Sequence, residues 1–255
     1  MAESAAARFA HPFGQPVTQV VIDDLALETL RIEGDDARHL AASLRLAVGD
    51  TFVATDGRGR VARLEASAIS RRGVEARVLE RARVPAPELR LWLVADAEGA
   101  RGDWIVEKAV EFGAFGFLPA RAARPGRVDR WRRVARAALK QSLSAYELRI
   151  EADRPALEVA GARAAAPQGG FGVWIAHPNG ADPLLQELVP QGDLFLVCGP
   201  PGGFSTADLG AWEALPAACR VGLGELRLRA ESAALMLLAA AALRRPPAAR
   251  GPETA

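Results

Sequence analysis

The chain has 255 residues, half of them hydrophobic and a quarter charged, with a formal net charge of +1. These values predict an ordinary globular protein of one large or two small domains, and they exclude a chain that coats nucleic acid non-specifically. Only two cysteines, without paired spacing, and three histidines are present, so we expect reduced thiols and no metal.

Nothing in the sequence indicates a membrane partner. The longest uncharged apolar run, Ser232 to Leu243, is too short to cross a bilayer, and the N-terminus lacks the basic-then-apolar order of a signal peptide. We therefore expect a cytoplasmic protein.

Residues 1–84 are predicted to form a small β-barrel domain with one helix. Short alternating runs indicate strands at Val17–Ile22, Thr51–Thr55, Val61–Ile69 and Val74–Leu79. Turn signals separate them at Asp56-Gly57-Arg58-Gly59 and Arg72-Gly73. The helix is expected to begin near Asp35 and Asp36, with Leu40 and Leu44 on one face. The segment Val84-Pro85-Ala86-Pro87 breaks both helix and strand, so we place a domain boundary there.

Residues 88–245 are predicted to form an α/β domain with a parallel sheet, because strand-like and helical segments alternate. Strands are expected at Leu89–Ala95, Phe115–Leu118, Val173–Ala176, Leu194–Cys198 and Arg220–Leu223, and helices at Trp104–Phe112, Val128–Leu143 and Ser232–Leu243. Ligands of such sheets bind at the carboxyl ends of the strands. Residues 246–255, rich in Pro and Ala, are expected to be a disordered tail.

Two loops of this domain could carry chemistry. The apolar run ending at Cys198 opens into Gly199-Pro200-Pro201-Gly202-Gly203, and Ser205 is a plausible N-cap with Asp208 at the N3 position. This loop matches neither a dinucleotide fingerprint nor a phosphate loop, which disfavours a phosphate-bearing cofactor. A bare strand-to-helix turn is the alternative interpretation.

The second loop, Val221 to Arg229, precedes a helix of almost unbroken Ala and Leu. A helix that is apolar on every side must be buried all round, either in the domain or in a subunit interface. Arg229 and Glu231 stand at its start, and charges at the edge of a buried element need partners. A structural ion pair between them is one interpretation.

The segment Arg121 to Lys140 contains eight basic residues against one acid, Asp129. Within the expected helix, one face carries Trp131, Val134, Ala138 and Ser142, and another carries Arg132, Arg133, Arg136 and Lys140. The functional interpretation is contact with RNA phosphates, without sequence readout. A solvated face is the alternative.

Four motifs in this order resemble the RsmE family of 16S rRNA uridine N3-methyltransferases. They are Gly199-Pro-x-Gly-Gly-Phe204, Leu223-Gly-x-x-x-Leu-Arg-x-Glu-Ser-Ala233, Lys108-Ala-x-Glu-x-Gly113 and Gln141-Ser142. In the N-terminal domain, His39-Leu40-x-x-x-Leu44-Arg45 and Asp56-Gly57-x-Gly59 are similar to the PUA-like domain of that family. The resemblance covers roughly residues 8 to 243.

The resemblance implies a SPOUT-type α/β fold with a C-terminal trefoil knot, preceded by a small PUA-like β-barrel domain. It further implies S-adenosyl-L-methionine as the cofactor, 16S rRNA or the small ribosomal subunit as the partner, and a homodimer that completes the site. The implied cofactor-binding residues are Cys198, Gly199, Pro200, Gly202, Gly203, Leu223, Gly224 and Leu228. Arg229, Arg124 and Glu231 are the implied catalytic residues, and Arg132, Arg133, Arg136, Lys140 and Arg45 the expected RNA-binding residues.

Four positions depart from the family pattern. Pro201 replaces a glutamate, Leu226 an arginine, Glu98-Gly99-Ala100 a Lys-Gly-Asp, and Ser144 an arginine. These losses of polar groups leave open a rival function, an RNA-binding pseudo-methyltransferase. A second rival is a small-molecule nucleotide-binding protein that uses the Gly199–Gly203 loop.

Overall fold

The computed structural model describes residues 11–14, 18–70, 72–166, 169–182 and 191–245. These residues form two compact units, one holding the residues up to Ala86 together with Leu139–Glu147, and the other holding Pro87–Ala138 and the chain from Leu148 onward. The tail predicted at 246–255, and Val17 at the start of the first predicted strand, lie outside the described residues.

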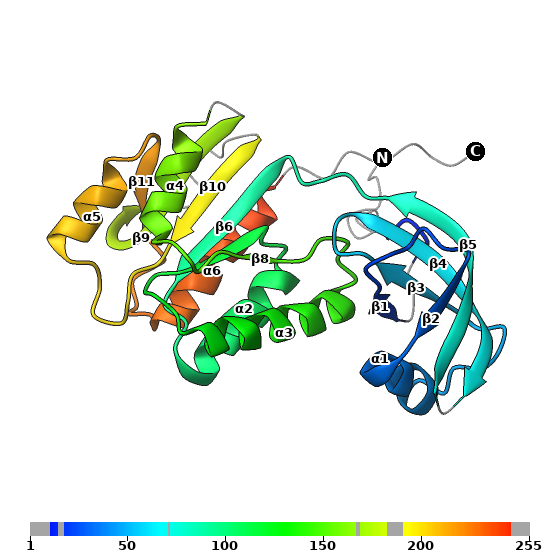
Figure 1. Ribbon diagram of the computed structural model, residues 1–255. Helices are drawn as coiled ribbons and strands as arrows, with labels where there is room; N and C mark the ends of the chain where they lie inside the picture. Colours follow the sequence, from blue (N-terminus) through cyan, green and yellow to red (C-terminus); the bar gives the residue numbers. More distant parts are fainter. Residues whose placement is uncertain (1–10, 15–17, 71, 167–168, 183–190, 246–255) are drawn as a thin grey trace. The chain divides into compact units, whose positions relative to one another are not determined.

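The first unit is built on a five-stranded sheet (Figure 1). Its order is β1 (Gln19–Val21), β3 (Thr51–Thr55), β4 (Arg60–Ser70), β5 (Gly73–Arg83) and β2 (Thr29–Ile32). The β1–β3 pair is parallel and the other pairs are antiparallel. Alternating side chains such as Phe52, Leu64 and Val74 are buried on one face, as the period of two predicts.

The helix of this unit differs from the expected one. A short α1 (Gly34–Arg38) continues into a π-helical turn, η2 (His39–Ser43), in which the Leu44 amide donates to the His39 carbonyl five residues earlier. Because a π turn takes up more residues than an α turn, Leu40 and Leu44 do not share a face. Leu40 is fully buried, whereas Leu44 is 37% exposed.

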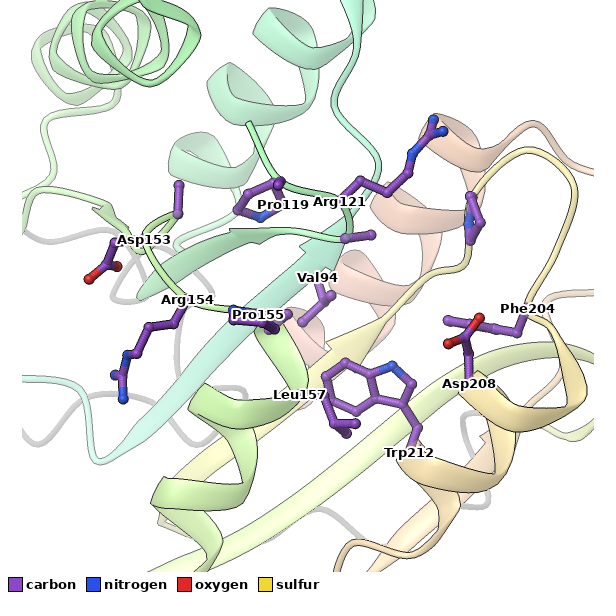
Figure 2. A pocket seen from close by; sticks show the side chains of 15 residues that line it. Val94, Pro119, Arg121, Asp153, Arg154, Pro155, Leu157, Phe204, Asp208 and Trp212 are labelled. Carbon is purple, nitrogen blue, oxygen red and sulfur yellow. The ribbon is translucent and has the colours of Figure 1, made fainter. Parts of the chain in front are cut away.

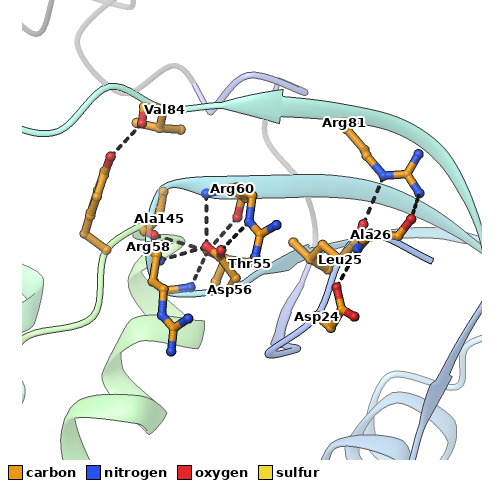
Figure 3. A network of polar contacts seen from close by, with 12 residues as sticks. Asp24, Leu25, Ala26, Thr55, Asp56, Arg58, Arg60, Arg81, Val84 and Ala145 are labelled. Carbon is orange, nitrogen blue, oxygen red and sulfur yellow. Dashed lines mark hydrogen bonds and ion pairs between the residues drawn. The ribbon is translucent and has the colours of Figure 1, made fainter. Parts of the chain in front are cut away.

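The Asp56–Gly59 turn holds the segment Leu139–Glu147 within the first unit (Figure 3). The buried Asp56 carboxylate accepts hydrogen bonds from the amides of Arg58 and Arg60, at 2.8 and 3.0 Å, and from Arg60 Nε at 2.7 Å. Burial opposes its ionisation, but these donors outweigh that cost and lower the pKa of Asp56. The Thr55 hydroxyl donates to the Ala145 carbonyl at 3.2 Å, and the Gly59 amide to the same oxygen at 2.9 Å.

The second unit contains the predicted parallel sheet. Its order is β11 (Ala218–Val221), β9 (Gly170–Ala181), β10 (Gly192–Val197), β6 (Leu89–Ala95), β7 (Gly116–Pro119) and β8 (Arg149–Ile150). All five pairings are parallel. The central strands β6 and β10 are buried on both faces, as the apolar runs Leu91–Ala95 and Leu194–Cys198 predict.

Five helices lie wholly or mainly in the described part of the second unit. They are α2 (Gly99–Glu111), α3 (Pro125–Ser142), α4 (Ala156–Ala164), α5 (Thr206–Glu213) and α6 (Ala230–Leu243). α4 and α5 contribute Val159, Ala160 and Trp212 to a core with Val94 and Phe195. α6 packs on β6, β9 and β10 and against α2, on the side of the sheet opposite α4 (Figure 1). Two helices begin before their predicted starts. The opening turn of α2 is Gly99-Ala100-Arg101-Gly102, which has no apolar periodicity, while α3 begins with Pro125, whose fixed φ suits the first helical position.

α6 is not buried all round within the chain. Of the two alternatives that its sequence left open, burial within the domain is therefore wrong, and burial in a subunit interface stays a prediction. Ala234, Leu237, Leu238 and Ala241 are buried, whereas Met236 is 47% and Leu243 is 83% exposed. One apolar face of the helix therefore remains uncovered. No helix in the described ranges is long and apolar enough to cross a membrane.

Candidate functional site

The loops that follow β10 and β11 meet at the carboxyl edge of the sheet, beside the end of β9. The Gly222 amide donates to the Ala181 carbonyl at 2.8 Å, joining the ends of β11 and β9. The Cys198 thiol, at the end of β10, donates to the Ala230 carbonyl at 3.4 Å. Both predicted loops thus converge on one edge of the sheet, as parallel strands require.

The loop after β10 is a tight turn. The Gly203 amide donates to the Pro200 carbonyl at 2.8 Å, which places Pro201 at the second turn position, where its fixed φ is favourable. Gly203 has φ +81°, a conformation that favours glycine. The Ser205 hydroxyl accepts from the Asp208 amide at 3.1 Å, which confirms the predicted N-cap of α5.

Three glycines of these loops leave open space beside the backbone. A Cβ atom added at Gly202, Gly203 or Gly224 would meet no atom within 4 Å. A Cβ added at Gly199 would instead lie 3.0 Å from the Phe204 ring, so that glycine is required by packing. Bare backbone facing open space suits a ligand held by close approach to main-chain groups, and these residues therefore fit the cofactor assigned to them.

A charged cluster borders this edge of the sheet. The Glu231 carboxylate pairs with Arg101 of α2 at 3.2 Å, so the structure does not bring it together with Arg229 as the sequence suggested. Arg229 is the exposed N-cap residue of α6. The nearly buried Asp96, at the end of β6, pairs with Arg121.

Burial raises the pKa of the Cys198 thiol to about 12, and the nearby negative charges of Asp96 and Glu231 add to the shift. The thiol is therefore neutral at physiological pH.

The basic segment Arg121 to Lys140 has more acidic partners than its sequence suggests. Arg127 and Arg130 pair with Asp103 of α2, at 3.3 and 2.5 Å, and Arg121 pairs with Asp96. Arg132 pairs with Asp129 at 3.1 Å. The excess of positive charge counted along the segment is therefore reduced on this surface, because carboxylates distant in sequence lie beside it.

The expected RNA-binding residues differ in their surroundings. Lys140 belongs to the first unit, where it pairs with Asp36 at 2.5 Å and is partly buried. Arg132 and Arg133 are exposed on α3, Arg136 is half-buried, and Arg45 is exposed in the loop after η2. Arg124 is exposed just before α3, and its carbonyl accepts from the Arg127 amide at 2.9 Å.

A cavity of about 540 Å³ opens beside the loop after β10 (Figure 2). Its walls come from the ends of β6 and β7, the segment leading into α4, Pro200 and Phe204 of the loop, and α5. Trp212 and Leu157 face the interior, and Arg121 and Arg154 lie on opposite sides. In the described part of the chain, no group of three His, Cys, Asp or Glu side chains is placed to hold a metal ion.

Comparisons with known proteins define the class. A family model described as an RNA methyltransferase domain matches residues 87–242, and a model described as an RNA methyltransferase PUA domain matches residues 32–79. The two units thus belong to an RNA methyltransferase. The predicted SPOUT-type α/β fold with a PUA-like N-terminal domain is confirmed as a fold class, while the knot stays a prediction.

Individual relatives narrow the class to a family. The chain is 33% identical to ribosomal RNA small subunit methyltransferase E of Mycobacterium bovis, over 82% of this chain and 84% of the relative. The Bacillus subtilis protein of the same name is 25% identical, with 83% and 89% covered. The crystal structure of ribosomal RNA small subunit methyltransferase E from Neisseria gonorrhoeae, bound to S-adenosyl methionine, is similar with a TM-score of 0.73 and 22% identity over 88% of this chain and 95% of that one. The chain belongs to the ribosomal RNA small subunit methyltransferase E family.

Proposed function

We propose that this protein is an S-adenosylmethionine-dependent methyltransferase that methylates N3 of a uridine in 16S rRNA. The observation that carries the proposal is that two loops, Gly199–Gly203 and Val221–Arg229, converge on the carboxyl edge of a parallel sheet in a chain of this family. We call them the first and second glycine loops. The relative from Neisseria gonorrhoeae has S-adenosyl methionine bound, and the names of the relatives specify ribosomal RNA. Such a reaction places the protein in the cytoplasm, where ribosomes assemble.

In this proposal, the cofactor lies against backbone of both loops. Gly202, Gly203 and Gly224 offer the open space described above, and Leu223 and Leu228 supply apolar contacts. Bound S-adenosylmethionine supplies an electrophilic methyl group. Cys198 orders the site through its contact with Ala230 and is not a nucleophile, because its thiol stays protonated.

The chemical task of the chain is to stabilise a uridine that has lost its N3 proton and to align it. A positioned arginine does both, since its charge opposes the negative charge that develops on the base. Arg229 is the first candidate, because it stands where the second loop enters α6, one residue before the Ala230 carbonyl that contacts Cys198. Arg124 is the second candidate. Glu231 is held by Arg101 and orients the start of α6 rather than Arg229.

RNA phosphates are proposed to contact the exposed Arg133 and Arg132 of α3, together with the half-buried Arg136. Arg45 serves the same role in the PUA-like domain. Lys140 remains in this set only as a weaker candidate, since its ammonium group is engaged by Asp36. These contacts fix the register of the RNA and carry no sequence information.

The protein is proposed to act as a homodimer, with the uncovered face of α6 as the interface. Met236 and Leu243 would otherwise expose large apolar side chains on a helix without charge between Ser232 and Leu243. The second glycine loop leads directly into this helix, so a partner on α6 would close the cofactor site. The C-terminal trefoil knot belongs to the same proposal.

The alternative of an RNA-binding pseudo-methyltransferase rests on the four departures from the family pattern. The structure gives two of them a local role: Pro201 fits its turn, and the Ser144 hydroxyl donates to the Tyr146 carbonyl at 3.0 Å. Leu226 is 83% exposed, and Glu98 lies 3.5 Å from Arg121.

Calorimetry combined with a methyl-transfer assay separates these functions. The proposal predicts that S-adenosylmethionine binds, that ATP does not, and that methyl groups are transferred to small-subunit RNA. Cofactor binding without transfer would establish the pseudo-methyltransferase, and ATP binding in place of S-adenosylmethionine would establish the nucleotide-binding protein.

A further inference from the structure

The cavity beside the loop after β10 is built mostly from residues that the cofactor assignment does not use. Of the eight cofactor-binding candidates, only Pro200 lines it. The second glycine loop, Val221 to Arg229, contributes no lining residue. The cavity thus adjoins the cofactor loop and remains available to a second ligand.

The interior of this cavity suits a flat ring. Trp212 is 6% exposed and faces the interior, with Leu157 and Val94 beside it. Phe204 and three prolines, at positions 119, 155 and 200, complete the apolar wall. Flat apolar and aromatic faces stack on nucleobases, and proteins use them to hold bases that have left the helical stack. The volume of about 540 Å³ lies within the ordinary range for small-molecule sites.

The rim of the cavity carries two arginines, which suit a phosphate backbone, and two carboxylates, Asp153 and Asp208, of which Asp208 accepts a hydrogen bond from the Ser205 hydroxyl. Arg121 and Arg154 lie on opposite sides, and their side chains are 54% and 52% exposed. Arg154 lies 3.9 Å from Glu151, a separation long enough to leave its guanidinium hydrogen bonds for a ligand. Arg121 and Ala122 of the lining belong to the loop that leads to Arg124, the second catalytic candidate.

We infer that this cavity receives the target pyrimidine nucleotide of the RNA, with the base against Trp212 and Phe204 and the adjoining phosphate on Arg154. This inference rests on the proposed function and deepens it, because it assigns the second substrate a place beside the cofactor loop. Arg154 and Trp212 are then substrate-positioning residues that no sequence motif indicated.

Two variants test the assignment without altering the cofactor loops. Ala122→Trp fills the cavity from an exposed lining position and leaves all charges in place. Arg154→Gln removes the rim charge, and Arg149→Gln is its matched control, because Arg149 is an exposed arginine of the same segment that does not line the cavity. Uridine 5′-monophosphate and S-adenosylhomocysteine are the probes, titrated separately by calorimetry, and KM for small-subunit RNA is measured in the methyl-transfer assay.

The inference predicts that Ala122→Trp and Arg154→Gln each weaken binding of uridine 5′-monophosphate and raise KM for RNA by roughly tenfold, as expected for the loss of a charged hydrogen bond or of the base site. Arg149→Gln should match the wild type, and all variants should bind S-adenosylhomocysteine equally. Weaker S-adenosylhomocysteine binding by Ala122→Trp would overturn the inference by assigning the cavity to the cofactor. Wild-type affinity of both variants for uridine 5′-monophosphate, or no binding to the wild type at millimolar concentration, would also overturn it.

These outcomes are distinct from failure of the proposed function. A wild-type protein that binds S-adenosylmethionine and methylates RNA, with both cavity variants equally active, would contradict only the cavity assignment. A wild-type protein that methylates no RNA would contradict the proposed function, whereas the binding titrations would still decide whether the cavity takes a pyrimidine nucleotide.

Discussion

Valine substitutions at Gly202 and Gly203 separate backbone strain from ligand contact in the loop after β10. Both positions offer open space for a side chain, but only Gly203 has a positive φ, at +81°. A residue with a Cβ atom in that conformation costs about 1–2 kcal/mol. Gly203→Val should therefore lower Tm by roughly 2–8 °C. Gly202→Val should leave Tm nearly unchanged.

Cofactor binding should respond differently from stability. If the backbone of this loop approaches S-adenosylmethionine, both valine variants place methyl groups where the ligand lies, and both should lose about tenfold or more in affinity. Gly210→Val is the control, because Gly210 lies in α5 with open space around it and no positive φ. That variant should change stability by less than about 0.5 kcal/mol and leave affinity intact.

Calorimetry and thermal unfolding of the three variants provide the measurement. A folded Gly202→Val protein with wild-type affinity for S-adenosylmethionine would refute the cofactor assignment, because the open space beside Gly202 would then hold no ligand. An equal loss of affinity in Gly210→Val would show that α5, and not the loop, governs binding.

Three further predictions follow from the charges and from α6. Arg133→Gln should lower the slope of log K against log salt for RNA binding by roughly 0.7–0.9. The effect of Arg132→Gln should be smaller, because Asp129 already pairs with Arg132. Equal slopes in the wild type and Arg133→Gln would mean that this face is solvated and does not contact RNA. Asp56→Asn should destabilise the protein most at neutral pH. The lowered pKa of Asp56 contributes stability at pH values above its ordinary pKa of 3.8, and this stability is lost as the pH falls through the lower pKa of the folded state. Urea unfolding at pH 7 and pH 3 measures the effect, and a loss of stability that is independent of pH would contradict it. Met236→Glu should convert a dimer into monomers in light scattering, whereas a wild type with the mass of one chain would exclude the dimer.

The sequence predicted the strands of the second unit well, because its central strands are buried on both faces. Leu89–Ala95 was predicted to the residue, since five consecutive apolar residues, Leu91–Ala95, follow the break at Pro87 and precede Asp96. Thr29–Ile32 was missed as β2: four alternating residues at the edge of a sheet give a weak signal, and pairing with β5 determines their conformation. The π turn at His39–Ser43 has no sequence signal that hydrophobic periodicity could detect.

The candidate site was predicted unevenly for a related reason. Both glycine loops were found from local sequence, because tight turns constrain which residues fit them. The partners of the charged residues were not found, since Arg101 and Asp103 come from α2 and Asp96 from β6. Counting charges along one segment therefore overestimated its excess of positive charge. Trp212 and Arg154 of the cavity belong to no motif and become neighbours only through the fold.

The most direct test of the proposed function is nucleoside mass spectrometry of small-subunit RNA incubated with the purified protein and S-adenosylmethionine. The substrate is 30S subunits from a strain that lacks the corresponding enzyme. We expect 3-methyluridine at close to one residue per 16S rRNA. The methyl-transfer rate of Arg229→Gln should be at least about a hundredfold lower, with RNA binding unchanged. Methylation at a ribose hydroxyl or at another base, or no methylation despite bound cofactor, would contradict it.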